Sequence, residues 1–468
     1  MRRIRRSRMP RPALRALPPA RVARSIAVAT LFIVAASAGC RHEPPRPDVL
    51  LVTIDTLRSD HCSAYGYAVP TTPTLERLAS GGVLYRRAYA ESSTTAPSHA
   101  VLMTGRHFRT FGLTRNGGTL PDDVETLAES MHAVGYETAG FISSFPLIGR
   151  FGFSQGFDIY EDRFVPEEAS AGRRHPGQQA HDREAGATLA RVVAWLETRN
   201  DTKPLFLWVH FVDPHFPYRP PASFEGDWPT GHDTAIERYD GEVRYADQQL
   251  GRLIDRLAAR ETRRGQLIVV TSDHGEGLGD HDWMTHGINL YEEAVRVPLI
   301  AKWKGHLPAK NVVDDPVGLI DVAPGILSLL EIDPKTEVHG RHLFDPPEAG
   351  RSIFLQRRDY RSSHERGRLI AGEMTAVVAG SSKLIVAPGE QRRELYDLAA
   401  DAREQTDLLK NLPPPAAASP ARDAIENLFR RLDAELFGWQ SRFPAAPKSN
   451  ERLDLETRKA LRSLGYVD

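Results

Sequence analysis

Residues 48–55 decide the fold: Asp48-Val49-Leu50-Leu51-Val52-Thr53-Ile54-Asp55. This short run of apolar and β-branched residues does not alternate with polar ones, which is typical of a strand buried on both faces of a sheet. Strands of this kind that alternate with helices predict an α/β fold, with a large, mostly parallel sheet sandwiched by helices. Similar strand runs lie at 205–209 and 267–270, and helical patterns lie at 124–134, 184–198 and 241–260.

The pattern changes after about residue 345, where short strand candidates stand beside Gly- and Pro-containing turns. They predict a smaller C-terminal α+β subdomain that holds a short antiparallel sheet. The polar stretch 167–183 has no apolar period, so we expect an exposed loop there. We divide the chain into a signal peptide (1–40), a tether (41–47), a large domain (48–345), a C-terminal subdomain (346–440) and a C-terminal tail (441–468).

Charge is distributed unevenly along the 468 residues. The formal net charge is -1, but nine arginines lie in the first 24 residues, where there is no acidic residue. Without those nine, 51 basic residues face 61 acidic ones, a balance of -10. Because binding to a phosphate backbone needs clustered Lys and Arg, this acidic body argues against nucleic acid as a partner.

The N-terminal segment predicts export. An apolar stretch from Ile26 to Gly39 follows the arginines, and it is too short to span a bilayer but has the length of a secretory h-region. It ends in Ser37-Ala38-Gly39-Cys40, which resembles the lipobox of bacterial lipoproteins. We therefore expect a lipoprotein anchored by Cys40 to a membrane of the bacterial cell envelope, in the periplasm or at the surface. A plain cleavable signal and an uncleaved anchor are the alternatives.

Each of the three buried strands leads into residues that suit a metal or acid–base chemistry. Asp55 follows the first strand, Asp213-Pro214-His215 follow the second, and Asp273-His274-Gly275-Glu276 follow the third. Ligands of α/β sheets bind at the carboxyl ends of the strands, so the three runs predict one site. Carboxylates with imidazole suit a divalent cation. The alternative is that Asp55 and Asp273 cap helices.

A second segment, 92–106, has hydroxyl residues, then Pro97, then an apolar run, which together predict the start of a helix. Free backbone N–H groups at such an end favour an anionic ester. A threonine there could act as a nucleophile if a metal lowers the pKa of its hydroxyl group. Helix capping by Thr94 or Thr95 is the alternative.

With these residues in place, the chain resembles the sulfatase family of the alkaline phosphatase superfamily over most of residues 48–410. The resemblance implies that Thr95 stands at the nucleophile position and that Asp55, Asp273 and His274 are metal ligands. The segments that carry it are 50–61, 72–75, 95–106, 213–215, 273–276, 286–287, 291–292, 296–298 and 394–398.

The family pattern also implies roles for the remaining polar residues. His215 and His286 match positions that bind the ester oxygens or protonate the leaving group, so we count them as catalytic. His99 and Arg106 are expected to bind substrate, Arg106 in a supporting role. The expected cofactor is a divalent metal, calcium by resemblance, with manganese, magnesium or zinc as alternatives.

The chain departs from the family pattern at three places. Thr95 stands where sulfatases have Cys or Ser, so no formylglycine is expected, and His99 replaces the usual Arg. Thr56 replaces a second Asp, which leaves the number of metal ions open. The Gly-Lys-Trp-His segment of the family is missing after Thr138, which reduces the positive charge available to hold sulfate.

These observations predict an exported, metal-dependent hydrolase of sulfate or phosphate esters in which Thr95 is the nucleophile. The substrate would be a small molecule or an ester of a glycan or lipid. One alternative is a phosphoryl transferase that acts on an envelope lipid or glycan. The other is a lipoprotein that binds anions without catalysis.

Overall fold

The computed structural model describes residues 46–468, apart from 166, 169–180, 226–233, 261, 263, 347, 349, 366, 413–418, 448–452 and 464–468. The predicted signal peptide and Cys40 lie outside the described residues, as does much of the polar stretch 167–183. Within the described part of the chain, no helix is both long enough and apolar enough to cross a membrane.

The larger of two sheets has nine strands, and β1 (Asp48–Ile54) lies near its centre. β1 pairs in parallel with β5 (Leu205–Phe211) on one side and with β6 (Gln266–Ser272) on the other. The strand order is β4-β3-β5-β1-β6-β7-β2-β8, and β9 also pairs with β2. The predicted α/β fold with a mostly parallel sheet is confirmed. The other strands are β2 (Val83–Tyr89), β3 (Glu137–Phe141), β4 (Ile159–Glu161), β7 (Arg296–Trp303), β8 (Asn311–Val313) and β9 (Val317–Gly318).

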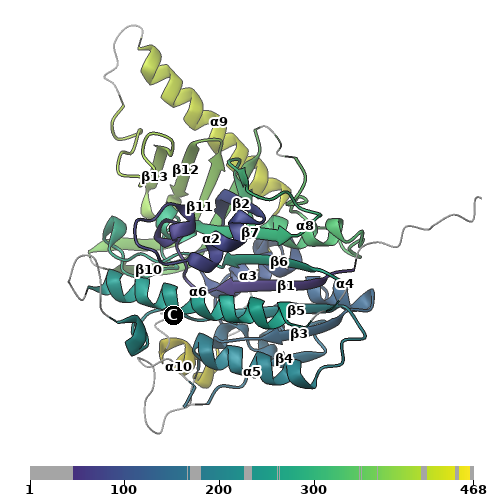
Figure 1. Ribbon diagram of the computed structural model, residues 1–468. Coiled ribbons are helices and arrows are strands. Elements are labelled where there is room, and N and C mark those ends of the chain that lie inside the picture. The colour runs from purple at the N-terminus through teal and green to yellow at the C-terminus, as the bar shows by residue number, and fades with distance from the viewer. Residues whose placement is uncertain are drawn as a thin grey trace, which may run out of the picture. The chain divides into compact units, whose positions relative to one another are not determined.

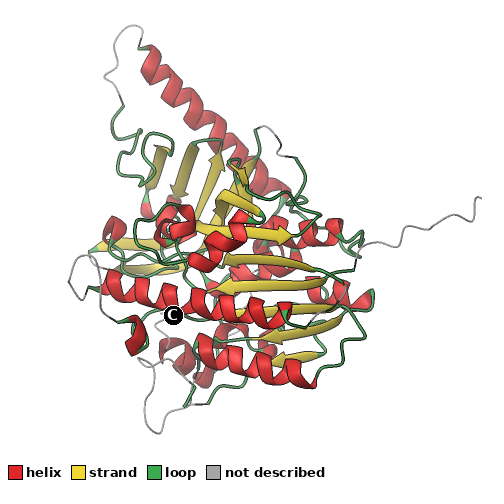
Figure 2. Ribbon diagram, in the orientation of Figure 1, coloured by secondary structure: helices red, strands yellow, loops and turns green. Residues whose placement is uncertain are grey.

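Helices cover both faces of this sheet because successive side chains of β1 point to opposite sides. Val49 and Leu51 belong to the apolar core that includes α3, α4 and α8, whereas Leu50 and Val52 belong to the core under α2, α5 and α6. Figures 1 and 2 show α5 and α6 in front of the sheet. The helices are α2 (Pro73–Ser80), α3 (Thr95–Thr104), α4 (Leu127–Ala133), α5 (Ala185–Thr198), α6 (Ala235–Ala258) and α8 (Val322–Leu329).

The second sheet is antiparallel, as predicted, and has the order β10-β11-β12-β13. One face packs against the segment of α7 (Glu292–Val295) through Met374 and Ile385. The other face packs against α9 (Pro420–Arg442) through Leu384 and Leu395. Its strands are β10 (Ser352–Glu365), β11 (Arg368–Ala379), β12 (Ser382–Ala387) and β13 (Arg392–Asp397). The predicted domain boundary at 345/346 falls in the segment between α8 and β10 and stays a prediction.

Local predictions differ from the structure at the start of α6 and at the end of the polar stretch 167–183. α6 begins at Ala235, ahead of the predicted start at 241, because Thr234 and Glu237 form a capping box. The expectation of an exposed loop at 167–183 is wrong at its end, where Arg183 is fully buried and donates to the carbonyl of Ile142 (2.7 Å). The last helix, α10 (Leu455–Ser463), packs on the main core through Ala460 and Leu461.

Candidate active site

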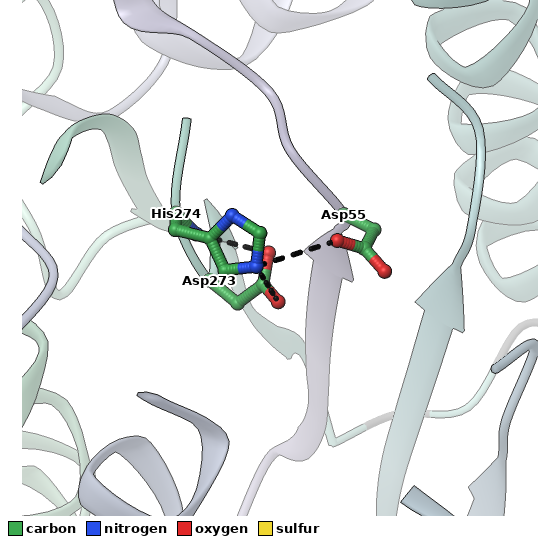
Figure 3. Close-up of side chains that lie close together, drawn as sticks. All are labelled: Asp55, Asp273 and His274. Carbon is green, nitrogen blue, oxygen red and sulfur yellow. Dashed lines mark hydrogen bonds and ion pairs between the residues drawn. The ribbon is translucent and has the colours of Figure 1, made fainter. Parts of the chain in front are cut away.

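The three predicted metal ligands lie together at the carboxyl edge of the large sheet. Ile54 of β1 stands opposite Ser272 of β6, so Asp55 and Asp273 leave the sheet side by side. Asp55, Asp273 and His274 are all fully buried, and one ligand atom from each lies within 4.8 Å of the others. Figure 3 shows the three side chains pointing toward a common point. The convergence follows from the parallel pairing of the two strands.

The hydrogen bonds of His274 fix which ring nitrogen faces the carboxylates. Nδ1 lies 2.9 Å from the carbonyl oxygen of Gly275 and donates to it, which leaves the lone pair on Nε2. Nε2 lies 3.3 Å from Asp273 Oδ2 and 3.7 Å from Asp55 Oδ1. Burial, only partly offset by Asp273, lowers the pKa of His274 to about 4. The ring is therefore neutral at pH 7 and suited to bind a metal.

The donor set fits a divalent cation. Asp273 Oδ2 accepts no hydrogen bond from the residues that the structure describes, although it is buried. Two buried carboxylates that face each other are costly without a compensating positive charge. Two carboxylate oxygens and an imidazole nitrogen supply ligands for Ca²⁺, Mg²⁺, Mn²⁺ or Zn²⁺. Neither Asp55 nor Asp273 stands at the N-cap of a described helix, so the capping alternative fails for both.

Thr95 lies beside this cluster as the first residue of α3. Its side chain is buried, and its Oγ1 is 3.3 Å from His274 Nε2. The N-cap position belongs to Thr94, whose side chain makes no capping hydrogen bond. The N-terminal end of α3 carries partial positive charge, which favours an anion or an alkoxide at this point.

His99 lies one helical turn after Thr95 and faces strand β1. Nδ1 donates to the carbonyl of Thr95 (2.9 Å), and Nε2 accepts from Thr53 Oγ1 (3.0 Å). The same hydroxyl oxygen accepts from the indole N–H of Trp208 (3.1 Å). Burial lowers the pKa of His99. Both ring nitrogens therefore contact the protein, and the predicted contact of His99 with substrate stays a prediction.

Arg106 does not join the cluster. It follows Gly105 at the C-terminal end of α3. At 1.5 Å per residue, that end lies about 15 Å from Thr95 along the helix axis. Arg106 therefore does not contact the metal-capable cluster, and its supporting role in substrate binding stays a prediction.

His215 and His286 both lie next to the three metal-capable residues. The ring centroid of His286 is 4.4 Å from that of His274 and 5.1 Å from that of His215. Nδ1 of His215 lies 2.7 Å from the carbonyl oxygen of Phe216, and Nδ1 of His286 lies 3.2 Å from Glu276 Oε1. The structure thus brings together every predicted catalytic residue and metal ligand.

Two site residues are missing from the sequence prediction. Glu276, which contacts His286, lies inside a quoted motif but received no role. His210, on β5, is fully buried with Nε2 3.7 Å from Asp55 Oδ2, and neither ring nitrogen has a hydrogen-bond partner in the described part of the chain. Burial, with the nearby His99 and His274, lowers the pKa of His210 well below its ordinary value. The sequence signal that could have found His210 is a histidine within an apolar strand that leads into Asp213.

Comparison with known proteins gives the same family over most of the chain. Residues 47–332 match the family model described as Sulfatase, and residues 279–426 match the one described as N-sulphoglucosamine sulphohydrolase, C-terminal. An arylsulfatase of Clostridium perfringens (strain 13 / Type A) is 23% identical over 494 residues, covering 89% of this chain and 100% of that protein. An N-acetylglucosamine-6-O-sulfatase of Bacteroides thetaiotaomicron is 20% identical, covering 81% of this chain and 86% of that protein.

Solved structures share the fold. The crystal structure of the phosphonate monoester hydrolase of Agrobacterium radiobacter superposes with a TM-score of 0.67 at 23% identity, covering 84% of this chain and 96% of that one. Since the first family model matches more than half of the chain, and the metal-capable cluster lies within that match, the protein belongs to the sulfatase family and is a sulfatase-like ester hydrolase.

Proposed function

We propose that this protein is an exported, metal-dependent hydrolase of sulfate or phosphate esters that uses Thr95 as its nucleophile. One observation carries the proposal: Thr95 Oγ1 lies 3.3 Å from His274 Nε2, at the N-terminal end of α3 and beside two buried carboxylates. A hydroxyl group in that place is next to both the expected cation and the positive end of a helix, and each favours its ionised form.

Asp55, Asp273 and His274 would hold the cation, and we propose calcium because two of the three ligands are carboxylates. When bound, the cation would lower the pKa of a neighbouring hydroxyl group and offset negative charge on the ester oxygens. The two carboxylates and the imidazole are fully buried in the folded protein. Because all three are buried, they need little reorganisation during the reaction.

The reaction would have two halves. In the first, Oγ1 of Thr95 bonds to sulfur or phosphorus while the bond to the leaving oxygen breaks, and His286 or His215 donates a proton to that oxygen. In the second, water attacks the same central atom, gives a proton back to the imidazole and releases Thr95. A threonine ester has no hydroxyl group on its carbon from which to eliminate the product, so water has to cleave it.

The substrate class is supported by relatives with different specificities. The names of the two curated relatives refer to sulfate esters, one of an aryl group and one of a sugar. The name of the structural neighbour from Agrobacterium refers to a phosphonate monoester. We propose a sulfate or phosphate ester of a small molecule, glycan or lipid. Export, and attachment to the membrane through Cys40, rest on the sequence of residues 1–40.

The nucleophile is tested by substituting Thr95 in purified full-length protein. Turnover of matched aryl sulfate, phosphate monoester and phosphate diester substrates would be measured with Ca²⁺, Mg²⁺, Mn²⁺ and Zn²⁺. We expect Thr95→Ala to lower kcat at least about 1,000-fold, because the covalent route is lost, and Thr95→Ser to retain part of the activity.

Thr104→Ala is the matched control, because Thr104 is a buried threonine at the other end of α3 whose Oγ1 donates to the carbonyl of Ala100. It should retain activity within a few-fold. Full activity of Thr95→Ala would rule out the covalent mechanism. A wild-type protein that binds the metal but turns over none of the three substrates would favour anion binding without catalysis.

A further inference from the structure

The segment that carries His286 is held by its backbone. Three successive carbonyl oxygens follow this residue, at positions 287–289, and each accepts a hydrogen bond from a side chain far away in the sequence. The three bonds run from Tyr360 Oη to Gly287 O (3.0 Å), from Arg357 Nη1 to Ile288 O (2.8 Å) and from Ser93 Oγ to Asn289 O (2.9 Å).

Two of the three donors, Tyr360 and Arg357, lie on β10 of the small antiparallel sheet. An apolar contact accompanies them, because Tyr360 and Ile370 pack with Trp283 and Ile288 on either side of His286 in the sequence. The small sheet therefore lies against the segment that bears a predicted catalytic group. The three predicted metal ligands all follow strands of the large sheet, so they do not reveal this contact of the small sheet with the site.

The imidazole of His286 is oriented from its other side. Nδ1 lies 3.2 Å from Glu276 Oε1, and Glu276 is fully buried. Gly287 takes a left-handed conformation (φ 84°), and a Cβ atom there would lie 3.4 Å from Thr94 Oγ1. The turn after His286 thus passes close to the N-terminal end of α3, and a displacement of its backbone would move the imidazole relative to Thr95.

We propose that Tyr360 is a positioning residue for His286: its hydroxyl group fixes the carbonyl of Gly287 and so holds the imidazole where it can protonate the leaving oxygen. The small sheet would thereby take part in proton transfer without touching substrate. This inference rests on the proposed function, which names His286 or His215 as the proton donor, and it takes His286 as that donor. Small displacements of a catalytic group reduce the rate strongly, because proton transfer needs hydrogen-bond distance.

A proton donor matters most for leaving groups that are poor without it. A nitrophenolate leaves readily as an anion, whereas unsubstituted phenol needs the proton in the transition state. Loss of the Tyr360 hydroxyl group should therefore slow phenyl esters far more than nitrophenyl esters. A purely structural loss would slow all esters by the same factor, since it only reduces the fraction of active protein.

The experiment compares Tyr360→Phe with Tyr160→Phe in the full-length protein, using aryl esters of increasing leaving-group basicity from the class that wild type hydrolyses. Tyr160 is the matched control, because it is a partly buried tyrosine whose Oη also donates to a backbone carbonyl, that of Leu147. It lies on β4, the edge strand that β3, β5 and β1 separate from β6. We expect Tyr360→Phe to lower kcat about 10-fold for phenyl esters and less than 2-fold for dinitrophenyl esters, with KM within 2-fold of wild type. Tyr160→Phe should leave the dependence on the leaving group unchanged.

His286→Gln separates the failure of this inference from failure of the proposed function. In one outcome, kcat of His286→Gln falls more steeply than that of wild type as the basicity of the leaving group increases, whereas kcat of Tyr360→Phe falls as it does in wild type. The positioning role of Tyr360 is then wrong, and the proposed function stands. A uniform loss across all esters in Tyr360→Phe would also overturn it. If the loss of activity in His286→Gln does not depend on the leaving group, His286 is not the proton donor; the inference about Tyr360 is then wrong, and His215 is left as the donor in the proposed function.

Discussion

Asp273 joins the metal-capable cluster to the backbone around it. Its Oδ1 accepts from the N–H groups of Thr56 (3.3 Å) and His274 (2.9 Å), while Oδ2 faces His274 Nε2. Thr56 adopts a left-handed conformation (φ 54°), which a β-branched residue takes only when its surroundings impose it. The hydrogen bond from Tyr239 Oη to the carbonyl of Thr56 (2.7 Å) helps to impose it. One carboxylate therefore orients a ligand and stabilises the strained turn after β1.

Metal removal should destabilise the protein, because the two carboxylates then face each other without a cation. A metal that binds only the folded state stabilises it by about 2.7 kcal/mol when its free concentration is about 100 times its Kd. We expect chelation with EDTA to lower Tm by several degrees, measured by differential scanning calorimetry. Asp55→Asn should abolish the metal-dependent part of Tm, whereas the exposed Asp123→Asn should leave it intact. Equal Tm values with and without metal in wild type would contradict a metal site here.

At the scale of single elements, α4 shows how local sequence sets a helix boundary. The apolar period predicts a start at 124, but the helix begins at Leu127. Thr126 and Glu129 form a capping box, in which Thr126 Oγ1 accepts from Glu129 N (3.1 Å) and Glu129 Oε2 accepts from Thr126 N (2.8 Å). A helix starts where its free N–H groups find acceptors, which the apolar period alone does not reveal.

Removing this cap should lower stability without affecting catalysis. Thr126→Ala loses the acceptor for one N–H group, which costs about 1 kcal/mol. Urea denaturation should show the loss, and kcat should equal that of wild type because α4 contributes no residue to the site. Thr126→Ser retains the hydroxyl group and should recover most of the stability. The exposed Thr198→Ala at the end of α5 should change it by less than about 0.5 kcal/mol.

Prediction of strands succeeded in the centre of the large sheet and missed strands toward its edges. β1, β5 and β6 consist mainly of apolar residues and are almost entirely buried, and such runs predict strands that are covered on both faces. β2 contains Arg86 and Arg87, and β3 contains a glycine. These two strands form because a neighbouring strand supplies hydrogen bonds, and pairing of this kind is not visible in one sequence.

On the scale of the whole molecule, buried ion pairs attach the small sheet to the large domain. Lys383 on β12 is fully buried, and its Nζ lies 3.0 Å from a carboxylate oxygen of both Glu292 and Glu404. His281 completes the connection, with Nδ1 3.0 Å from Glu293 Oε1 and Nε2 3.1 Å from the carbonyl oxygen of Glu404. Because both partners of His281 are acceptors, only the protonated ring can donate to both.

The pH dependence of stability should report this contact. Burial lowers the pKa of His281, but the hydrogen bond and charge of Glu293 raise it by more, so the pKa lies above its ordinary value. The stabilisation is therefore complete below the unfolded pKa of about 6.5 and is lost as pH rises through the folded pKa. Urea denaturation between pH 5.5 and pH 8.5 should show this decline, and His281→Gln should flatten it. The same alkaline decline in His281→Gln would assign it to other groups.

The sequence by itself determined the central sheet and the meeting of Asp55, Asp273 and His274. Three apolar runs each lead into polar residues, and the carboxyl ends of parallel strands share an edge whatever loops connect them. It did not show that Arg106, expected to bind substrate, lies beyond the far end of α3 from Thr95. Only the tertiary structure decided that Glu276 contacts His286, that His210 faces Asp55 and that Tyr360 reaches Gly287. Those contacts join segments with no common period, so they depend on how the sheets and loops pack.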